Sequence, residues 1–327
     1  MKRLLYTIVM SALLMVVGGA CVEDRAPIFP DNNINGGNDD EGKDDGEDDG
    51  KEEPVPPSNE DYPDTSWAAG ELDWVFDMSA VPEIRVEVTE EQWNELLKEY
   101  DRNSQTAAYI HCNTEFKSKG ETHYFEDTGL RLRGNTSRRR PEGNGGEQHK
   151  AEGADWRHVH FMLNLRKFVK DDEHSLRGVR KIHLKWFKED PSHVRELFCY
   201  DLFRRAGIWT ALQDVYCRVW VHVEGDSKPA YYGVYNMLER ADNHYVKRRV
   251  AKFGSDEGNL WKCVIGADFK SISDGKIGPD DPDRDYPYEL KENEGTFEEA
   301  AAQLKNIILN VSQLNDEDFY KWIQRVC

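Results

Sequence analysis

Apolar and polar residues alternate along several segments of the chain, and this period of two predicts β-strands. The clearest case is 215–223, where valines and a cysteine occupy every odd position. A short polar turn follows, and residues 231–238 predict a second strand that returns beside the first as a hairpin. Shorter strands are expected at 83–88, 130–132, 161–165, 260–264 and 286–290.

Apolar residues at helical spacing predict helices. Thr89 and Gln92 have the spacing of a capping box, and apolar residues continue from there to Tyr100. Ser192 is expected to cap a second helix that stops at Gly207. The apolar positions of this second helix are Val194, Leu197, Phe198 and Leu202. Two further helices are expected, one after a Thr296–Glu299 capping box and one from about residue 316 onward. The order of strands, one prominent helix, a hairpin and helices predicts an α+β fold class.

Residues 1–20 have the layout of a secretion signal. Lys2 and Arg3 precede an apolar stretch from Leu4 to Val17, and the small residues at 18–20 follow. The apolar stretch is short for a membrane span. We therefore expect an exported protein whose first 20 residues are a signal peptide.

Cys21 directly follows this leader, and the segment resembles the lipobox of bacterial lipoproteins, with Gly18 where that motif prefers leucine. The resemblance implies lipid attachment at Cys21, and the alternative is an ordinary signal peptide followed by a chance cysteine. Glu23 and Asp24 resemble the surface-export signal of Bacteroidetes lipoproteins. The expected location is therefore the outer membrane, with a lipid anchor and the protein at the cell surface.

Acidic residues are concentrated after the leader. Of the net charge of −19, residues 22–65 carry −13 and residues 1–21 carry +2, which leaves −8 for residues 66–327. Residues 21–65 are rich in Asp, Glu, Gly and Pro, so we expect a disordered linker. They lack the Gly-then-Glu pattern of an EF-hand, which argues against a calcium loop. Residues 66–327 can form one domain, and their mild acidity disfavours binding to nucleic acid.

The six cysteines include no Cys-x-x-Cys pair, which argues against a structural zinc site. If Cys21 is lipidated, five remain, so disulfides in an exported protein and buried free thiols are both open. The P-loop, Gly-x-Gly-x-x-Gly, His-Glu-x-x-His and Gly-x-Ser-x-Gly motifs are absent from the sequence. Common motifs therefore identify no catalytic residue.

A basic segment begins on the strand at 130–132. Alternation places Arg131 and Arg133 on one face, and Asn135 and Arg138 follow the turn at Gly134. Because a guanidinium group presents a planar fork to an anion, this group could bind a phosphate. The alternative is a solvated basic loop that pairs with acids of the same chain.

Three more residues are candidates on other segments. Glu196, on the second predicted helix, either orients a basic partner or is an exposed helical ion. Glu239 leaves the hairpin at a strand end, where binding groups tend to cluster. Lys262 lies on the strand at 260–264 and could meet a phosphate or an acid. The hairpin that leads to Glu239 also contains tyrosines, and cross-strand packing in the core explains this segment without any binding role.

Five stretches of the chain together resemble the CotH family, which is named for spore-coat proteins. They occur in the order of that family, with similar gaps, over roughly residues 80–327. The stretches are RLRGNTSR at 131–138, LKWFKEDPSHVRELFCYD at 184–201, YGVYNMLERAD at 232–242, GNLWKC at 258–263 and YELK at 288–291. The sequence is similar in particular to the branch of the family found in exported Bacteroidetes lipoproteins.

This resemblance implies an atypical protein-kinase-like fold, with a small-lobe sheet, a hairpin and helices. It implies transfer of the terminal phosphate of ATP to a protein serine or threonine, with Mg²⁺ or Mn²⁺ as the metal. The protein substrate stays unknown. The nucleotide-binding candidates are Arg131, Arg133, Asn135, Arg138, Glu196, Glu239 and Lys262.

Two departures from the family pattern affect this expectation. Many members have a Lys-Lys pair leading into a strand, whereas the equivalent strand here opens with His158, Val159 and His160. Lys262 or Arg133 is therefore expected to replace the phosphate-contacting lysine. The Asp-containing segments that hold metal in the family follow a helix like that at 319–326. We therefore expect a C-terminally incomplete lobe, no metal ligand or catalytic residue in this chain, and little phosphoryl transfer by it alone.

The alternative function is a non-catalytic binding or structural lipoprotein of the cell surface with the same fold. The missing Lys-Lys pair and metal carboxylates motivate this alternative. A glycan-processing enzyme is a third option, but the sequence offers no pair of carboxylates for that chemistry.

Overall fold

The computed structural model describes residues 72–326, except residues 172, 255–257, 271, 274, 282–285 and 293–294. The expected signal peptide, Cys21 and the acidic linker lie outside the described residues. The described chain combines helices with strands, and this confirms the α+β class. The four described cysteines, Cys112, Cys199, Cys217 and Cys263, are free thiols.

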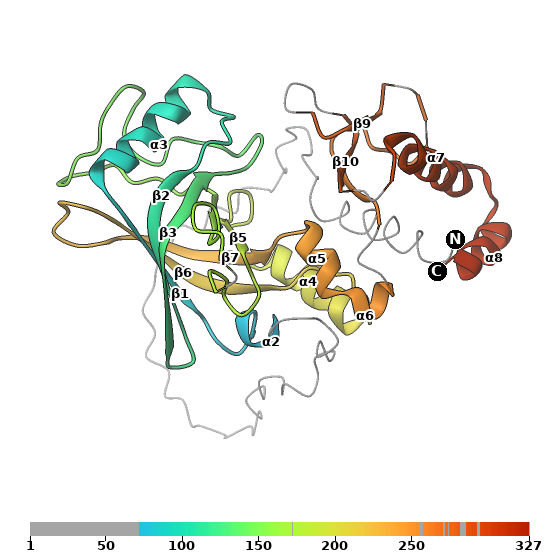
Figure 1. Cartoon of the computed structure of the whole chain (residues 1–327), viewed down its shortest axis with the longest axis horizontal. Coiled ribbons are helices and arrows are strands. Elements are labelled where there is room, and N and C mark those ends of the chain that lie inside the picture. Colours follow the sequence, from blue (N-terminus) through green and yellow to red (C-terminus); the bar gives the residue numbers. More distant parts are fainter. Residues whose placement is uncertain are drawn as a thin grey trace, which may run out of the picture.

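Seven strands close into a barrel, which forms the left part of the molecule in Figure 1. They are β1 (Glu83–Val88), β2 (Ile110–Ser118), β3 (Glu121–Leu132), β4 (Phe161–Asn164), β5 (Lys181–Lys185), β6 (Asp214–Val223) and β7 (Ala230–Glu239). Their order is β1-β2-β3-β4-β5-β7-β6, and β6 closes the barrel by pairing parallel to β1. The sequence predicted the β6–β7 hairpin but neither β2, β5 nor the closure.

Alternation of residues along each strand fills the barrel interior. The odd-numbered residues of β6 from Val215 to Val223 belong to the main core, together with Leu130, Leu132, Ile182 and Leu184. The intervening residues of β3 and β5 point to the outer face, because successive side chains of a strand alternate between its two faces. This separation leaves the outer face free to carry polar groups.

Helix α3 (Glu90–Arg102) packs against β2, and it begins as the sequence predicted. The Thr89 hydroxyl accepts a hydrogen bond from the backbone N–H of Gln92 at 3.2 Å. The Gln92 side chain does not complete the capping box. Its oxygen accepts from the backbone N–H of His111 at 2.9 Å, and so it joins the helix to β2.

Helix α4 (Arg195–Arg205) differs from the prediction in its cap and in its buried face. Ser192 does not cap it, and the N-cap residue Val194 makes no side-chain cap bond. The carboxylate of Asp190 accepts the backbone N–H of Arg195 instead, at 2.8 Å. The buried residues are Leu197, Tyr200 and Arg204, whereas the predicted apolar positions Val194, Phe198 and Leu202 are 47%, 59% and 50% exposed. The prediction of the buried face was therefore right for Leu197 and wrong for the other three positions.

The chain after the hairpin forms short helices and then a smaller unit with its own core. Helices α5 (Asn243–Arg248) and α6 (Val250–Phe253) follow β7, and α2 (Leu72–Val75) precedes the barrel. The smaller unit contains β8 (Leu260–Cys263), β9 (Ile277–Pro279), β10 (Tyr288–Glu292), α7 (Phe297–Gln313) and α8 (Asp316–Val326). Figure 1 shows β9, β10, α7 and α8 beyond α4–α6, on the side away from β1–β3. The Thr296–Glu299 capping box of α7 is present, as predicted.

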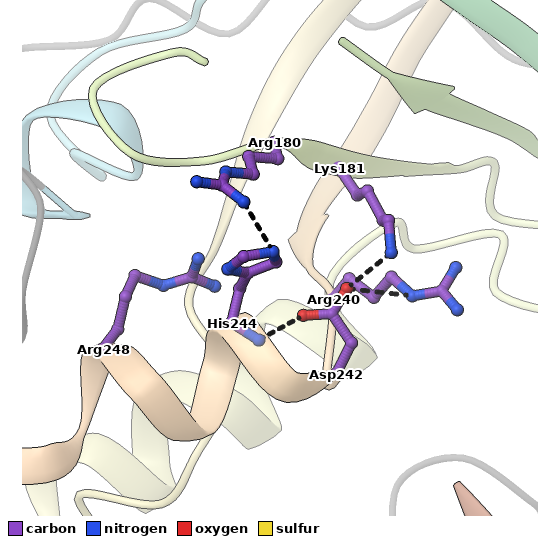
Figure 2. Close-up of a pocket in the computed structure, with 6 residues that line it drawn as sticks. All are labelled: Arg180, Lys181, Arg240, Asp242, His244 and Arg248. Carbon is purple, nitrogen blue, oxygen red and sulfur yellow. Dashed lines mark hydrogen bonds and ion pairs between the residues drawn. The ribbon is translucent and has the colours of Figure 1, made fainter. Parts of the chain in front are cut away.

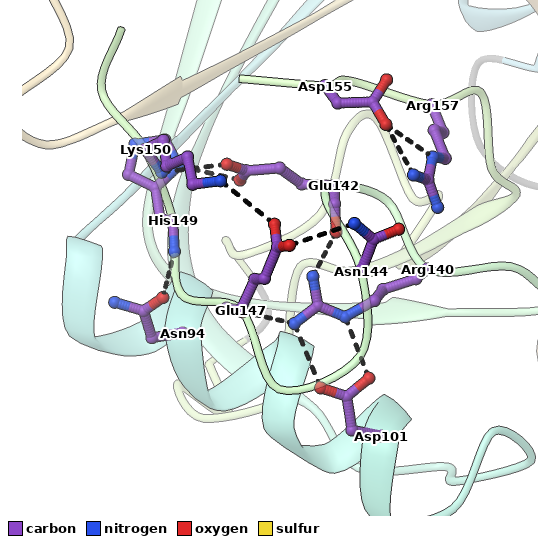
Figure 3. A network of polar contacts seen from close by, with 10 residues as sticks. All are labelled: Asn94, Asp101, Arg140, Glu142, Asn144, Glu147, His149, Lys150, Asp155 and Arg157. Carbon is purple, nitrogen blue, oxygen red and sulfur yellow. Dashed lines mark hydrogen bonds and ion pairs between the residues drawn. The ribbon is translucent and has the colours of Figure 1, made fainter. Parts of the chain in front are cut away.

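The long loop between β3 and β4 is attached to α3 by a buried polar network (Figure 3). Arg140 pairs with Asp101, with 2.9 Å between Nε and Oδ1. Glu142 is 2% exposed and accepts from the Trp93 indole N–H at 2.9 Å and from the Lys150 backbone N–H at 2.9 Å. The His149 ring lies between two carboxylates, 2.8 Å from Glu142 and 3.1 Å from Asp226. This network fixes the loop on one side of the barrel.

Replacing Glu142 by leucine is expected to destabilise the protein by about 2–4 kcal/mol, because buried donors lose their acceptor. Chemical denaturation followed by tryptophan fluorescence measures the change. Faster tryptic cleavage in the loop at 138–157 is expected as well. Glu152→Leu is the matched control, since Glu152 is exposed in the same loop. Equal stabilities of the two variants would contradict a structural role for the network.

Candidate phosphate-binding face

Side chains of four neighbouring strands form rows across the outer face of the barrel. The register aligns Arg131 with Met162, Met162 with His183, and His183 with Leu238. In the next row, the backbone N–H of Arg133 donates to the carbonyl of His160, and Lys185 pairs with Asn236. The fold therefore places Arg131 and Arg133, on β3 and at its end, on the same face as His183 and Lys185 of β5, with β4 between them.

Lys185 forms an ion pair with Glu196, which the first turn of α4 places over this face. The other oxygen of Glu196 accepts from the side-chain amide of Asn236 at 3.0 Å. Burial, together with the nearby Arg133, lowers the pKa of Lys185, whereas Glu196 opposes that shift. The strand and the helix thus hold a lysine–glutamate pair in one fixed geometry.

A buried relay of polar groups supports Glu196 from behind. The Asn236 amide also donates to Asp214 at 3.3 Å, and Arg204 pairs with Asp214 at 2.9 Å. Asn236 and Asp214 are 0% and 1% exposed. Burial raises the pKa of Asp214 to about 7, against the opposing effect of Arg204. The relay explains why α4 buries Arg204 and turns Glu196 toward Asn236.

Positive charge dominates this outer face. Burial, followed by the effects of Arg131 and Arg240, lowers the pKa of Arg133 to about 10, although Glu196 opposes the shift. Burial and Arg133 also lower the pKa of His160 to about 3, and they move the pKa of His183 in the same direction. At neutral pH the two histidines are therefore uncharged, whereas the arginines keep their charge.

Arg133 is the cation of this face that is best placed to receive an anion. Its side chain forms no hydrogen bond or ion pair with any residue that the structure describes. Arg131 is partly engaged, since it donates to the carbonyl of Leu132 at 3.1 Å. Arg133 and the Glu196-held Lys185 together offer guanidinium and ammonium donors to one oxyanion.

The other sequence candidates have different surroundings. Arg138 donates to the carbonyls of Gly134 at 2.7 Å, Ser104 at 3.3 Å and Thr106, and so it ties the loop together. Asn135 is exposed, and its carbonyl accepts from Gln105 at 3.2 Å. Lys262 lies in the smaller sheet and pairs with Glu289 at 3.0 Å. The structure does not gather these residues with Arg133 and Lys185.

Glu239 is 0% exposed, so a bound nucleotide cannot reach its carboxylate. Its two oxygens accept from Arg249 at 2.8 and 2.7 Å and from Arg248 at 2.8 Å. The expectation that Glu239 contacts a ligand is corrected, because the carboxylate joins the end of β7 to the helices that follow it.

Lys185 was missed as a functional residue at the sequence level. Leu184 and Lys185 open one of the recognised stretches, but the strand β5 was not predicted. Its alternation of Lys181, His183 and Lys185 with Ile182 and Leu184 is the signal that could have identified it. Lys185, and not Lys262, is the lysine that the fold places on the same face of the barrel as Arg131 and Arg133.

The structure combines a closed barrel with a lysine–glutamate ion pair between one strand and the helix after it. The family model described as CotH kinase protein matches residues 130–327, and the chain belongs to that family. No curated protein and no solved structure matches the chain. The family match covers the end of β3, all of β4–β10 and α4–α8, and therefore the residues of the face described above.

Proposed function

We propose that Arg133 and Lys185 bind the phosphates of ATP on the outer face of the barrel. The activity that this binding serves is ATP-dependent phosphoryl transfer to a serine or threonine of a protein. The observation that carries the proposal is the ion pair between Lys185 on β5 and Glu196 on α4.

Protein kinases use such a pair. A strand lysine contacts the nucleotide phosphates, a helix glutamate holds that lysine, and a loop between two preceding strands covers the phosphates. The order of elements is the same here: β3, a long loop, β4, then β5 with Lys185 and α4 with Glu196. The sequence of elements and the ion pair together support a kinase-like arrangement for this part of the chain.

The residues present fit the phosphate groups of ATP but not a metal site. Arg133 and Lys185 supply the positive charge that phosphates require. Within the described ranges, no group of three His, Cys, Asp or Glu side chains could hold a metal ion. We therefore derive no step through Mg²⁺ or Mn²⁺. The residues described here bind and orient the phosphates, and Glu196 and Asn236 keep Lys185 in place.

The location of the protein is also a proposal. We infer export and lipid attachment at Cys21 from the leader, with residues 21–65 as the linker to the outer membrane. The domain from 66 to 327 then faces a protein substrate outside the cell. Within the part of the chain that the structure describes, no helix has the length and apolar character to span a membrane.

Isothermal titration calorimetry with ATP and Mg²⁺ or Mn²⁺ tests the proposal. Saturable binding of ATP is the expected result. Absence of binding would contradict the proposal and favour the alternative of a non-catalytic surface protein. Labelled ATP then measures transfer to a protein mixture. We still predict little phosphoryl transfer by this chain alone. Robust transfer would contradict this prediction but not the proposed binding of ATP.

A further inference from the structure

The polar cluster at the start of β5 lies outside the phosphate-binding face but leaves no room for a ligand. Figure 2 shows Asp242 paired with Lys181 and Arg240, at 3.0 and 3.5 Å. Asp242 also accepts the backbone N–H of His244 at 3.0 Å and so caps α5. The cluster encloses no space that a water molecule can enter. Its charges therefore serve to join β5, β7 and α5.

A groove with more space lies between the turn of the β6–β7 hairpin and the loop that precedes β4. Its volume is about 390 Å³, which is within the range of about 300–1,000 Å³ for small-ligand pockets. The hairpin lines the groove with Trp220, Tyr231 and the turn at 226–230. The loop lines it with residues from the segment 151–156. The groove is therefore large enough for a small ligand.

A buried polar contact joins the two walls of this groove. Nε2 of His149, just before the loop wall, lies 3.1 Å from a carboxylate oxygen of Asp226 in the hairpin turn. The two side chains are only 1% and 6% exposed, and Nδ1 of His149 lies 2.8 Å from the Glu142 carboxylate. The network that fixes the loop on the barrel therefore also fixes the groove, which is preformed.

The hairpin wall presents an exposed aromatic surface. The rings of Tyr231 and Trp220 pack together with 4.4 Å between their centroids, and Tyr231 is 49% exposed. Small residues of the loop wall, Ala151, Gly153 and Ala154, line the same groove. A Cβ atom at Gly153 would meet no atom within 4 Å. The groove thus leaves space for a ring that packs on the aromatic wall.

Hydrogen-bonding groups lie beside this aromatic surface. Ser227, Lys228 and Tyr231 are exposed, and their side chains form no hydrogen bond or ion pair with any residue that the structure describes. The lining contains one acidic side chain, Asp226, and one basic side chain, Lys228. It therefore has no excess charge that would select an ion. Free hydroxyl and ammonium groups instead suit a neutral ligand that carries hydroxyl groups.

We propose that this groove binds a sugar ring of a neutral glycan. One face of a sugar ring carries C–H groups that pack on an aromatic ring, and its rim carries hydroxyl groups that donate and accept hydrogen bonds. Tyr231 matches the apolar face, and Ser227 and Lys228 match the rim. The site does not depend on ATP binding or on phosphoryl transfer.

Isothermal titration calorimetry of the full chain with cellohexaose, maltohexaose and chitohexaose tests this site. Saturable binding of at least one of these neutral oligosaccharides is expected, and high salt is expected to leave it unchanged because salt screens only charges. Tyr231→Ala is expected to weaken binding about 10-fold through loss of the ring contact. Tyr124→Ala is the matched control, since Tyr124 is also 49% exposed but lies on β3, outside the groove.

A second variant fills the groove and leaves the hairpin unchanged. Ala151→Trp is expected to abolish oligosaccharide binding, and thermal denaturation checks that the barrel is intact. Unchanged affinity of Ala151→Trp, or equal affinities of Tyr231→Ala and Tyr124→Ala, would overturn the proposal. No binding of any neutral oligosaccharide would overturn it as well, including the case in which acidic oligogalacturonate or a proline-rich peptide binds instead. Lys185→Met is expected to keep the oligosaccharide affinity, so none of these results decides whether ATP binds at Lys185.

Discussion

Replacing Lys185 by methionine is expected to weaken ATP binding about 10- to 100-fold, which corresponds to one lost hydrogen bond between charged groups. Methionine keeps the length and apolar stem of lysine but cannot donate to a phosphate. Glu196 loses one partner but keeps its contact with Asn236 at 3.0 Å. Fluorescent-nucleotide displacement on the purified chain measures the change in affinity.

Lys188→Met is the control for this experiment. Lys188 lies three residues further along the chain and pairs with the exposed Glu189 at 3.3 Å. The same charge is thus removed outside the Lys185–Glu196 pair. If both variants bind ATP equally well, Lys185 does not contact the phosphates. Thermal denaturation of both variants checks that the barrel is intact.

Replacing Glu239 by glutamine is expected to cost about 3–5 kcal/mol of stability at neutral pH, because a buried ion pair loses one partner. Glutamine has nearly the same shape, so the loss comes from the charge. It leaves Arg249, which is 0% exposed, and Arg248 without their shared carboxylate. Urea denaturation gives the change, with Glu298→Gln as the control because Glu298 is exposed in the first turn of α7. A loss of stability in Glu239→Gln below that in Glu298→Gln would contradict a structural role for Glu239.

The pH dependence of stability provides a second readout for Glu239. Burial alone raises the pKa of this carboxyl, but Arg249 and Arg248 outweigh it and lower the pKa from 4.5 to about 2. The folded state therefore binds this proton more weakly than the unfolded state. The stabilisation is present above about pH 4.5 and is lost as the pH falls toward 2. The difference in the free energy of unfolding between wild type and Glu239→Gln is expected to be smaller at pH 3 than at neutral pH.

Alternation in sequence was sufficient to predict the β6–β7 hairpin, because each strand has one face in a continuous core. The same approach failed for α4. Its apolar positions Val194, Phe198 and Leu202 are exposed, and Arg204 is buried together with Leu197 and Tyr200. Periodicity assigns apolar residues to the interior, so it cannot identify a helix that is held by Glu196 and Arg204. Closure of the barrel depends on pairing between β1 and β6, which local sequence does not encode.

The sequence predicted only part of the candidate site, because some of its residues are distant from one another in the chain. Arg131 and Arg133 are close in sequence, and their alternation placed them on one face. Lys185 and Glu196 are 11 residues apart, and Asn236 is 40 residues from Glu196, so only the fold brings them together. Glu239 illustrates the opposite error, because a carboxylate at a strand end also has a structural use when arginines nine and ten residues further along the chain donate to it.

The most direct test of the central claim is covalent labelling with an acyl-phosphate derivative of ATP. The lysine amine attacks the acyl carbon, forms an amide and releases ATP, so the reagent marks a lysine beside the bound phosphates. Burial and Arg133 lower the pKa of Lys185, which favours this attack. Mass spectrometry is expected to find the label on Lys185 and to find protection of that residue by excess ATP. Labelling of Lys188 or Lys262 with Lys185 unmodified would contradict the account.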